Sequence, residues 1–173
     1  MLDDLEMQAE GLHLAERAVE VGELSVAQYA EIELVGRLHA SVGRQVHVGT
    51  VDGLEIHGRL TATGADWMLV SDGGNVWFTH LTAVAVLRGL APGSLPAEAR
   101  PLTARLSLRS ALRRFAEDRR PCSIHLRGGR ALQGNLIHVG RDFAVLRQGQ
   151  GGESVTVPLS AVAVVQGRPE DAA

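Results

Sequence analysis

Apolar and polar residues alternate along ten short runs of the chain, and these runs fall into two sets of five. A period of two residues is typical of β-strands that bury one face. The first set covers about 45–50, 54–63, 66–72, 75–79 and 83–88, and the second covers about 121–126, 131–139, 142–148, 154–158 and 161–166. The pattern therefore predicts a mainly β fold.

The two sets are copies of one unit. The segment VHVGTVDGLEIHGRLTATGADWMLV at 46–70 follows the same plan as CSIHLRGGRALQGNLIHVGRDFAVL at 122–146. Likewise, HLTAVAVLRG, which begins at His80, matches PLSAVAVVQG, which begins at Pro158. A repeat of this length indicates two copies of one small folding unit. A core built from roughly 60–70 residues is marginal alone, so we expect the copies to dock on each other or on another chain.

Glycines mark the turns and bends of both copies. The dipeptides at 52–53 and 128–129 contain glycine and favour the tight turns of β-hairpins. Gly58 and Gly134 stand inside long runs, where glycine suits a sharp bend or a bulge. Short strands that bend and curl predict small closed barrels.

Helical spacing of apolar residues occurs in three places. Residues 2–21 predict an amphipathic helix with acidic side chains on its polar faces. Before each strand set, a short alternating segment (30–34 and 102–108) is followed by helical spacing, which favours a short extended segment and then a helix. A continuous helix from about 25 to 42 remains the alternative in the first copy.

The charge distribution is uneven although the net charge of the 173 residues is only −3. Residues 1–35 contain nine acidic residues and one arginine, whereas residues 100–148 contain eleven arginines and three acidic residues. Such asymmetry indicates an interaction surface. The acidic helix either packs on the rest of the chain or protrudes to bind a partner or a second copy of this chain.

Sites for catalysis or metal binding find no support in the sequence. The seven histidines lack metal-ligand spacing, and the single cysteine, Cys122, suits a core strand. His47 and His57 are placed to meet across a hairpin, as are His125 and His138, and both pairs are interpreted as strand residues facing solvent. We therefore expect no enzymatic activity, no cofactor and no metal. The lone cysteine and the absence of an apolar span or a basic leader predict a cytoplasmic protein with no membrane contact.

Arginines form the best candidate binding site. Arg105, Arg109 and Arg113 are spaced by four, so the sequence predicts that they line one helix face. Arginine forks suit phosphates, and a basic stripe is typical of nucleic-acid binding. The candidate RNA- or partner-binding residues are Arg105, Arg109, Arg113, Arg114, Arg119, Arg120, Arg127, Arg130 and Arg141.

The second copy resembles the Sm-like barrel of Hfq and the LSm proteins. The resemblance rests on a helix followed by a turn glycine, a glycine inside a long strand, and an aspartate before an apolar strand. These are Gly129, Gly134 and Asp142 in the second copy, with Gly53, Gly58 and Asp66 in the first. The whole chain is also similar to a family of tandem-barrel proteins from high-GC bacteria.

The resemblance implies two tandem Sm-like (SH3-like) β-barrels, each preceded by a helix, in addition to the acidic N-terminal helix. The expected segments are the helix at 1–24, a first barrel at 25–89, a Pro-rich linker at 90–101, a second barrel at 102–167 and a tail at 168–173. Sm-type barrels associate through the free edges of their fourth and fifth strands. The resemblance therefore implies a homo-oligomer, in which three copies would supply six ring positions.

The uridine-binding residues of Sm proteins do not carry over to this chain. The expected Asn after the motif aspartate is absent from both copies, and the Arg-Gly position holds Thr79-His80 or Val157-Pro158. Only His80 matches a histidine of Hfq. The sequence thus predicts a non-enzymatic binding module that contacts RNA phosphates through the arginines of the second barrel. The alternative is a protein–protein scaffold in which the acidic helix pairs with this basic face.

Overall fold

The computed structural model describes residue 29, residues 32–149 and residues 152–168. The predicted acidic helix at 1–24 and all of the predicted tail except Arg168 lie outside the described residues. The chain divides into two units after residue 33, and the unit that begins at Leu34 contains all the described strands. Ile32 and Glu33 are not helical, so the alternative of one helix from 25 to 42 is wrong.

Ten strands, two α-helices and short 3₁₀ turns make up the described part of this unit. All ten strands lie within about a residue of the runs that the sequence predicts. The helices are α2 (Leu34–Ala40) and α3 (Leu108–Glu117). The strands are β1 (Gln45–Thr50), β2 (Glu55–Thr63), β3 (Trp67–Ser71), β4 (Val76–His80), β5 (Val84–Arg88), β6 (Pro121–Leu126), β7 (Ala131–Val139), β8 (Phe143–Arg147), β9 (Ser154–Pro158) and β10 (Val162–Gly167).

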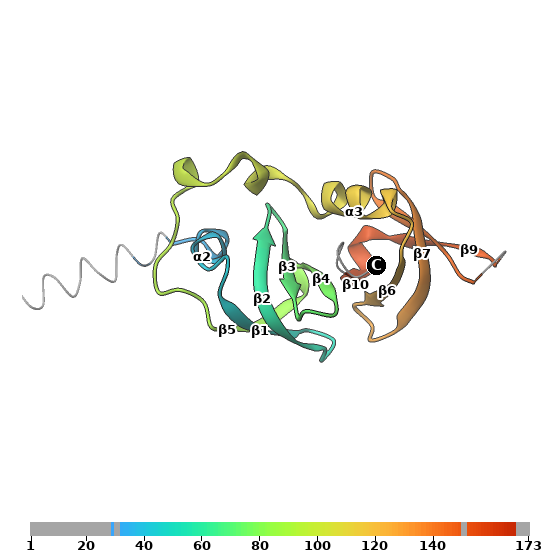
Figure 1. Ribbon diagram of the computed structural model, residues 1–173, viewed down its shortest axis with the longest axis horizontal. Helices are drawn as coiled ribbons and strands as arrows, with labels where there is room; N and C mark the ends of the chain where they lie inside the picture. Colours follow the sequence, from blue (N-terminus) through green and yellow to red (C-terminus); the bar gives the residue numbers. More distant parts are fainter. Residues whose placement is uncertain (1–28, 30–31, 150–151, 169–173) are drawn as a thin grey trace, which may run out of the picture. The chain divides into compact units, whose positions relative to one another are not determined.

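The strands form one antiparallel sheet in the order β5-β1-β2-β3-β4-β10-β6-β7-β8-β9 (Figure 1). The predicted fold class, two closed barrels in tandem, is therefore wrong. Closure would require β4 to pair with β5, and β9 with β10. Instead β5 pairs only with β1 among the described residues, while β4 pairs with β10 of the other half. The 3₁₀ turn η1 (Leu81–Ala83) separates β4 from β5 and takes the chain to the other end of its half.

The β4–β10 pairing is the junction between the two halves. Val164 stands opposite Thr79 and Gln166 opposite Trp77 in an antiparallel register. Beside the paired strands, the guanidinium of Arg127 donates to the carbonyl oxygen of Ser160 at 2.8 Å and to that of Thr82 at 3.1 Å. Backbone pairing and an arginine bridge therefore join the halves.

Each half also contributes side chains to the core of the other. Trp67 and Phe78 of the first half lie in the cluster built around Leu112 and Ile124, and the Phe78 and Phe115 ring centroids are 5.4 Å apart. Val164 lies in the cluster of the first half. Neither core is complete without the other half, because each includes apolar side chains from across the junction.

Matching glycines bend the second strand of each half. A Cβ on Gly58 would lie 2.4 Å from the carbonyl oxygen of Ser71, and one on Gly134 would lie 2.3 Å from that of Arg147. The pairing register shifts shortly after each glycine, between Leu60 and Ala62 in β2 and at the equivalent place in β7. The bends predicted from the sequence are present in both halves.

Helix α3 begins at Leu108, where the helical spacing of the sequence predicts it, but the segment before it differs from the prediction. Ser107 caps the helix by accepting a hydrogen bond from the Ser110 backbone N–H, which satisfies one of the free donors of the first turn. The alternating residues before it form a 3₁₀ turn, η3 (Leu102–Arg105), and not an extended segment. The expected extended segment is therefore wrong here. Leu106 ends this turn with its carbonyl oxygen aimed at Trp67 Nε1, 2.8 Å away.

Truncation of Trp67 is expected to damage the fold far more than truncation of Phe143, its equivalent in the repeat. Trp67→Ala removes a ring that is 7 % exposed and should lower the free energy of unfolding by about 3–5 kcal/mol. Phe143 is 39 % exposed, so Phe143→Ala in dilute protein should cost less than about 1 kcal/mol. Urea unfolding of both variants measures the difference. Equal losses would contradict the shared core.

Candidate functional site

The two ends of the sheet, β5 and β9, carry the clearest unsatisfied surface. They lie at opposite ends of the strand order (Figure 1). In the described residues, each pairs with a single neighbour, so one side of each backbone is open. An open edge presents unpaired N–H and C=O groups to another chain.

Strand β5 can be compared with β10, which begins with the same tripeptide, Val-Ala-Val. Within their halves the two strands occupy the same place, because Leu87 stands opposite Val48 and Val165 stands opposite Ile124. The second valine of this tripeptide is Val164 in β10, which is 0 % exposed beside β4, and Val86 in β5, which is 44 % exposed. The same short sequence is thus buried at the junction and bare at the free end.

An apolar residue next to β9 is also more exposed than its counterpart at the junction. Phe143 on β8 corresponds to Trp67 on β3, since Phe143 stands opposite Pro158 as Trp67 stands opposite His80. Trp67 is covered at the junction, whereas Phe143 is one of the exposed large apolar residues. Both free ends therefore expose apolar side chains whose counterparts are buried where the two halves meet.

A chain of polar contacts lines the open end at β5. Arg88 Nη1 lies 3.1 Å from His47 Nδ1, and the other ring nitrogen of His47 contacts the Glu55 carboxylate. His47 also stacks on His57 with ring centroids 4.0 Å apart, which confirms that this pair meets across the hairpin. The second expected pair is wrong, because His125 stands opposite Ala131 and not His138.

The helix face predicted for Arg105, Arg109 and Arg113 is not formed. Arg109 and Arg113 lie on α3, but Arg105 lies in η3, so the three do not share a helix. Arg113 is bonded to the carbonyl oxygens of Val139 at 3.1 Å and Gly140 at 3.4 Å. Arg127 bridges the junction between the halves. Among the nine candidate arginines, the exposed ones away from these contacts include Arg105, Arg119 and Arg130.

Two of the predicted arginines meet in a small cavity of about 270 Å³. Arg109 and Arg141 line it together with Asp66 and His80. Among the described residues, the buried Nε of Arg109 has no hydrogen-bond acceptor. Asp66 already accepts a 2.6 Å hydrogen bond from the Leu108 backbone N–H. The cavity therefore offers two guanidinium groups to an anion, partly offset by one carboxylate.

His80 serves the backbone in this cavity. Its Nδ1 accepts a hydrogen bond from the Thr82 N–H at 3.3 Å and lies 2.6 Å from the Thr82 hydroxyl oxygen. Burial lowers the pKa of the imidazole, and the opposing effect of Asp66 does not restore it to its usual value. His80 thus caps the η1 turn as a neutral ring.

Arg114 and Arg120 line a second cavity of about 380 Å³ between α3 and the first half. Trp67, Phe78 and Phe115 form part of its apolar wall. Arg120 pairs with the Asp118 carboxylate at 3.3 Å. Arg168, which is not among the nine predicted arginines, lines the same cavity. A ligand here would need both an apolar body and an anionic group.

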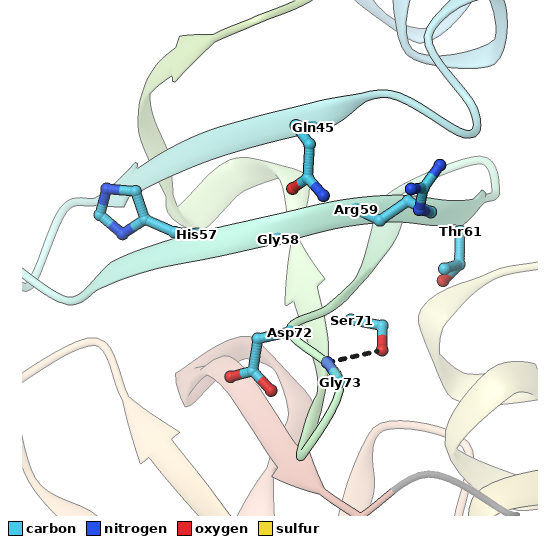
Figure 2. A pocket seen from close by; sticks show the side chains of 8 residues that line it. All are labelled: Gln45, His57, Gly58, Arg59, Thr61, Ser71, Asp72 and Gly73. Atoms are coloured by element: carbon cyan, nitrogen blue, oxygen red, sulfur yellow. Dashed lines mark hydrogen bonds between the residues drawn. The ribbon is translucent and has the colours of Figure 1, made fainter.

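A third cavity of about 490 Å³ lies over the bend of β2, and Figure 2 shows the side chains that line it. Its charged groups are already engaged. Arg59 donates to the Gly43 carbonyl oxygen at 2.7 Å, and Asp72 accepts from the Asn75 N–H at 2.7 Å and from Trp77 Nε1 at 3.1 Å. Burial alone would raise the pKa of Asp72, but these hydrogen bonds, together with one from Gly74, hold it below its usual value. The main charged groups of this cavity therefore already hold its turn through hydrogen bonds, which makes it a weaker ligand site than the cavity at Arg109.

Metal-binding geometry is absent from the part of the chain that the structure describes. Within it, no group of three or more His, Cys, Asp or Glu side chains could hold a metal ion. No helix in the same part is long and apolar enough to cross a membrane. Cys122 is buried in the strand β6, as its alternation with Ile124 predicts.

Sequence reasoning did not single out the exposed residues at the open edges. Val86 and Phe143 look like ordinary strand residues when each copy is read alone. The signal that could have found them was the repeat itself: aligning β5 with β10 and β8 with β3 identifies the positions whose burial must differ if only one junction exists per chain.

Comparison with known proteins does not assign the chain to a family. No protein-family model matches the chain, and no curated protein matches it. The resemblance to Sm-like proteins therefore stays a prediction.

The buried thiol should make stability depend on alkaline pH. Burial raises the pKa of Cys122 from 9.0 to about 11, so the folded state retains the proton that the unfolded state loses. The free energy of unfolding should therefore fall as pH rises from about 9 towards 11. Urea unfolding across this range should show a shallower fall for Cys122→Ala. An identical fall in both proteins would contradict the assignment.

Proposed function

We propose that this chain is a non-enzymatic assembly module in which β9 of one copy pairs with β5 of the next. The ten-stranded sheet would then continue from chain to chain. The observation that carries the proposal is the contrast between Val164, buried beside a neighbouring strand, and Val86, the same residue in the repeat, exposed on an open edge. A free edge with exposed apolar side chains favours association with another strand.

The intramolecular junction supplies the expected register. If β9 takes the place of β4, and β5 that of β10, Val157 of one copy stands opposite Val86 of the next. Thr156 then stands opposite Leu87, just as Phe78 stands opposite Val165 within the chain. The same arrangement would cover Phe143 as Trp67 is covered. The contact joins two different surfaces, so copies add head to tail and form either a ring or an open chain.

Self-association should depend on the β5 edge. Wild-type protein should be oligomeric at micromolar concentration in sedimentation velocity experiments, and Val86→Lys should weaken association at least about tenfold by placing a charge in the interface. Leu102→Lys is the matched control, because Leu102 is 83 % exposed in the η3 turn, outside both edge strands. A wild-type protein that stays monomeric at roughly 100 µM would overturn the proposal.

A second candidate function is RNA binding through the arginines of the second half. The cavity shared by Arg109 and Arg141, with the unpaired Nε of Arg109, favours it because guanidinium groups bind phosphate oxygens. The contacts that hold Arg113 and Arg127 reduce the number of arginines that can reach a ligand. This RNA site would therefore be smaller than the nine-residue surface expected from the sequence.

RNA binding should be steeply dependent on salt. The double variant Arg109→Ala/Arg141→Ala should weaken binding of labelled single-stranded RNA and reduce the salt slope by about 0.7 for each phosphate that the protein no longer neutralises. Arg59→Ala, on β2 of the first half and outside the nine candidate arginines, is the control. Wild-type protein that binds no RNA at about 50 mM salt would exclude this candidate.

A further inference from the structure

One polar contact at the junction between the two halves involves residues whose counterparts at the open ends of the sheet are charged. This difference bears on assembly. Beside the paired strands, Gln166 Nε2 on β10 donates a hydrogen bond to Asn75 Oδ1, just before β4, at 3.2 Å. Both residues are half-buried and neutral. They join the two halves at the end of the β4–β10 ladder.

The counterparts of these two residues lie at the open ends. Arg88 corresponds to Gln166. Arg88 follows Leu87, which stands opposite Val48, and Gln166 follows Val165, which stands opposite Ile124. Glu153 corresponds to Asn75, because their carbonyl oxygens accept the same hairpin hydrogen bond, from Gln148 N and from Asp72 N, each at 3.2 Å. The neutral pair inside the chain is thus replaced at the free ends by residues of opposite charge.

We infer that Arg88 of one copy of the chain and Glu153 of the next form an ion pair that fixes the register of the β5–β9 contact. This inference rests on the proposed assembly. The two side chains belong to opposite ends of a single sheet, so this pair forms only between copies. We therefore expect the strand that binds at the β5 edge to come from a second copy of this chain.

Local contacts favour this role for Arg88. The 3.1 Å contact with His47 Nδ1 holds the guanidinium against β1, and a guanidinium has about five N–H donors, so others remain for a carboxylate. Arg88 and Glu153 are both exposed in the single chain. Glu55 is the one carboxylate that β1 and β2 carry, and it is bonded to His47.

The expected benefit of the pair is selectivity. An exposed ion pair contributes little affinity, but like charges brought together oppose binding strongly. A strand that slips by one residue turns its side chains to the wrong face, so a charged contact at one end of the ladder excludes shifted pairings.

Charge exchange between copies tests the inference. Arg88→Glu and Glu153→Arg should each weaken self-association about tenfold or more in sedimentation velocity, because every contact then brings like charges together. The double variant Arg88→Glu/Glu153→Arg should recover association. An equimolar mixture of the two single variants should also associate, since alternation of the two proteins places opposite charges at every contact.

A neutral double variant serves as the matched control. Arg88→Gln/Glu153→Asn reproduces the polar pair of the internal junction, so it should associate with less dependence on salt than the wild type. Unchanged urea unfolding of each single variant at low concentration shows that the fold is intact.

The outcomes separate this inference from the assembly proposal. If Val86→Lys dissociates the oligomer but both charge reversals leave it unchanged, edge pairing stands and the ion pair is wrong. Failure of the double variant and of the mixture to recover association would also refute the pair. If the wild type does not associate at all, the assembly proposal fails and the ion pair fails with it.

Discussion

Pairing between β4 and β10 is the interaction on which the rest of the structure depends. It turns two five-stranded halves into one sheet and brings Trp67 and Phe78 into the core of the second half and Val164 into that of the first. Small units of this size bury too little apolar surface to be robust alone. The junction therefore provides cohesion that neither half has by itself.

The same pairing explains why the ends of the sheet are unusual. Both halves carry a strand that is built to be covered on one side, but each chain contains only one internal junction among its described strands. One β-edge of each type is left over, at β5 and β9. The exposed Val86 and Phe143 are consequences of a repeat that has been copied once, and association between copies would bury them in the way that their counterparts are already buried.

Local features of the fold, including the hairpins that turn at 52–53 and 128–129, could be predicted from the sequence, whereas the strand pairing that joins the two halves could not be derived from alternation. The alternation of residues located all ten strands, and glycines such as Gly58 marked the bends because a side chain there would collide with a neighbouring carbonyl. Closure within each half was wrongly predicted because alternation shows which face of a strand is buried but not which strand lies beside it. The extended segment at 102–108 was also wrong, since its alternation reflects a 3₁₀ turn that ends at the cap of α3.

The candidate sites, like the fold, could be predicted only in part from the sequence. Counting arginines identified the basic second half, and the structure brings Arg109 and Arg141 into one cavity. Sequence could not show that Arg113 and Arg127 hold backbone carbonyl groups, because these contacts join segments far apart in the chain. The charges at Arg88 and Glu153 were visible in the sequence, but they acquire meaning only beside the Gln166–Asn75 contact.

Disulfide trapping between copies tests the central claim most directly. In a Cys122→Ala background, Leu87→Cys in one protein and Thr156→Cys in another should lie opposite each other across the β5–β9 contact, within the Cα separation of about 4.4–6.8 Å that a disulfide needs. We predict rapid formation of a covalent dimer when the two proteins are mixed and mildly oxidised, and much slower formation when Ser154→Cys replaces Thr156→Cys. No dimer, or equal rates for the two partners, would contradict an assembly that repeats the internal junction.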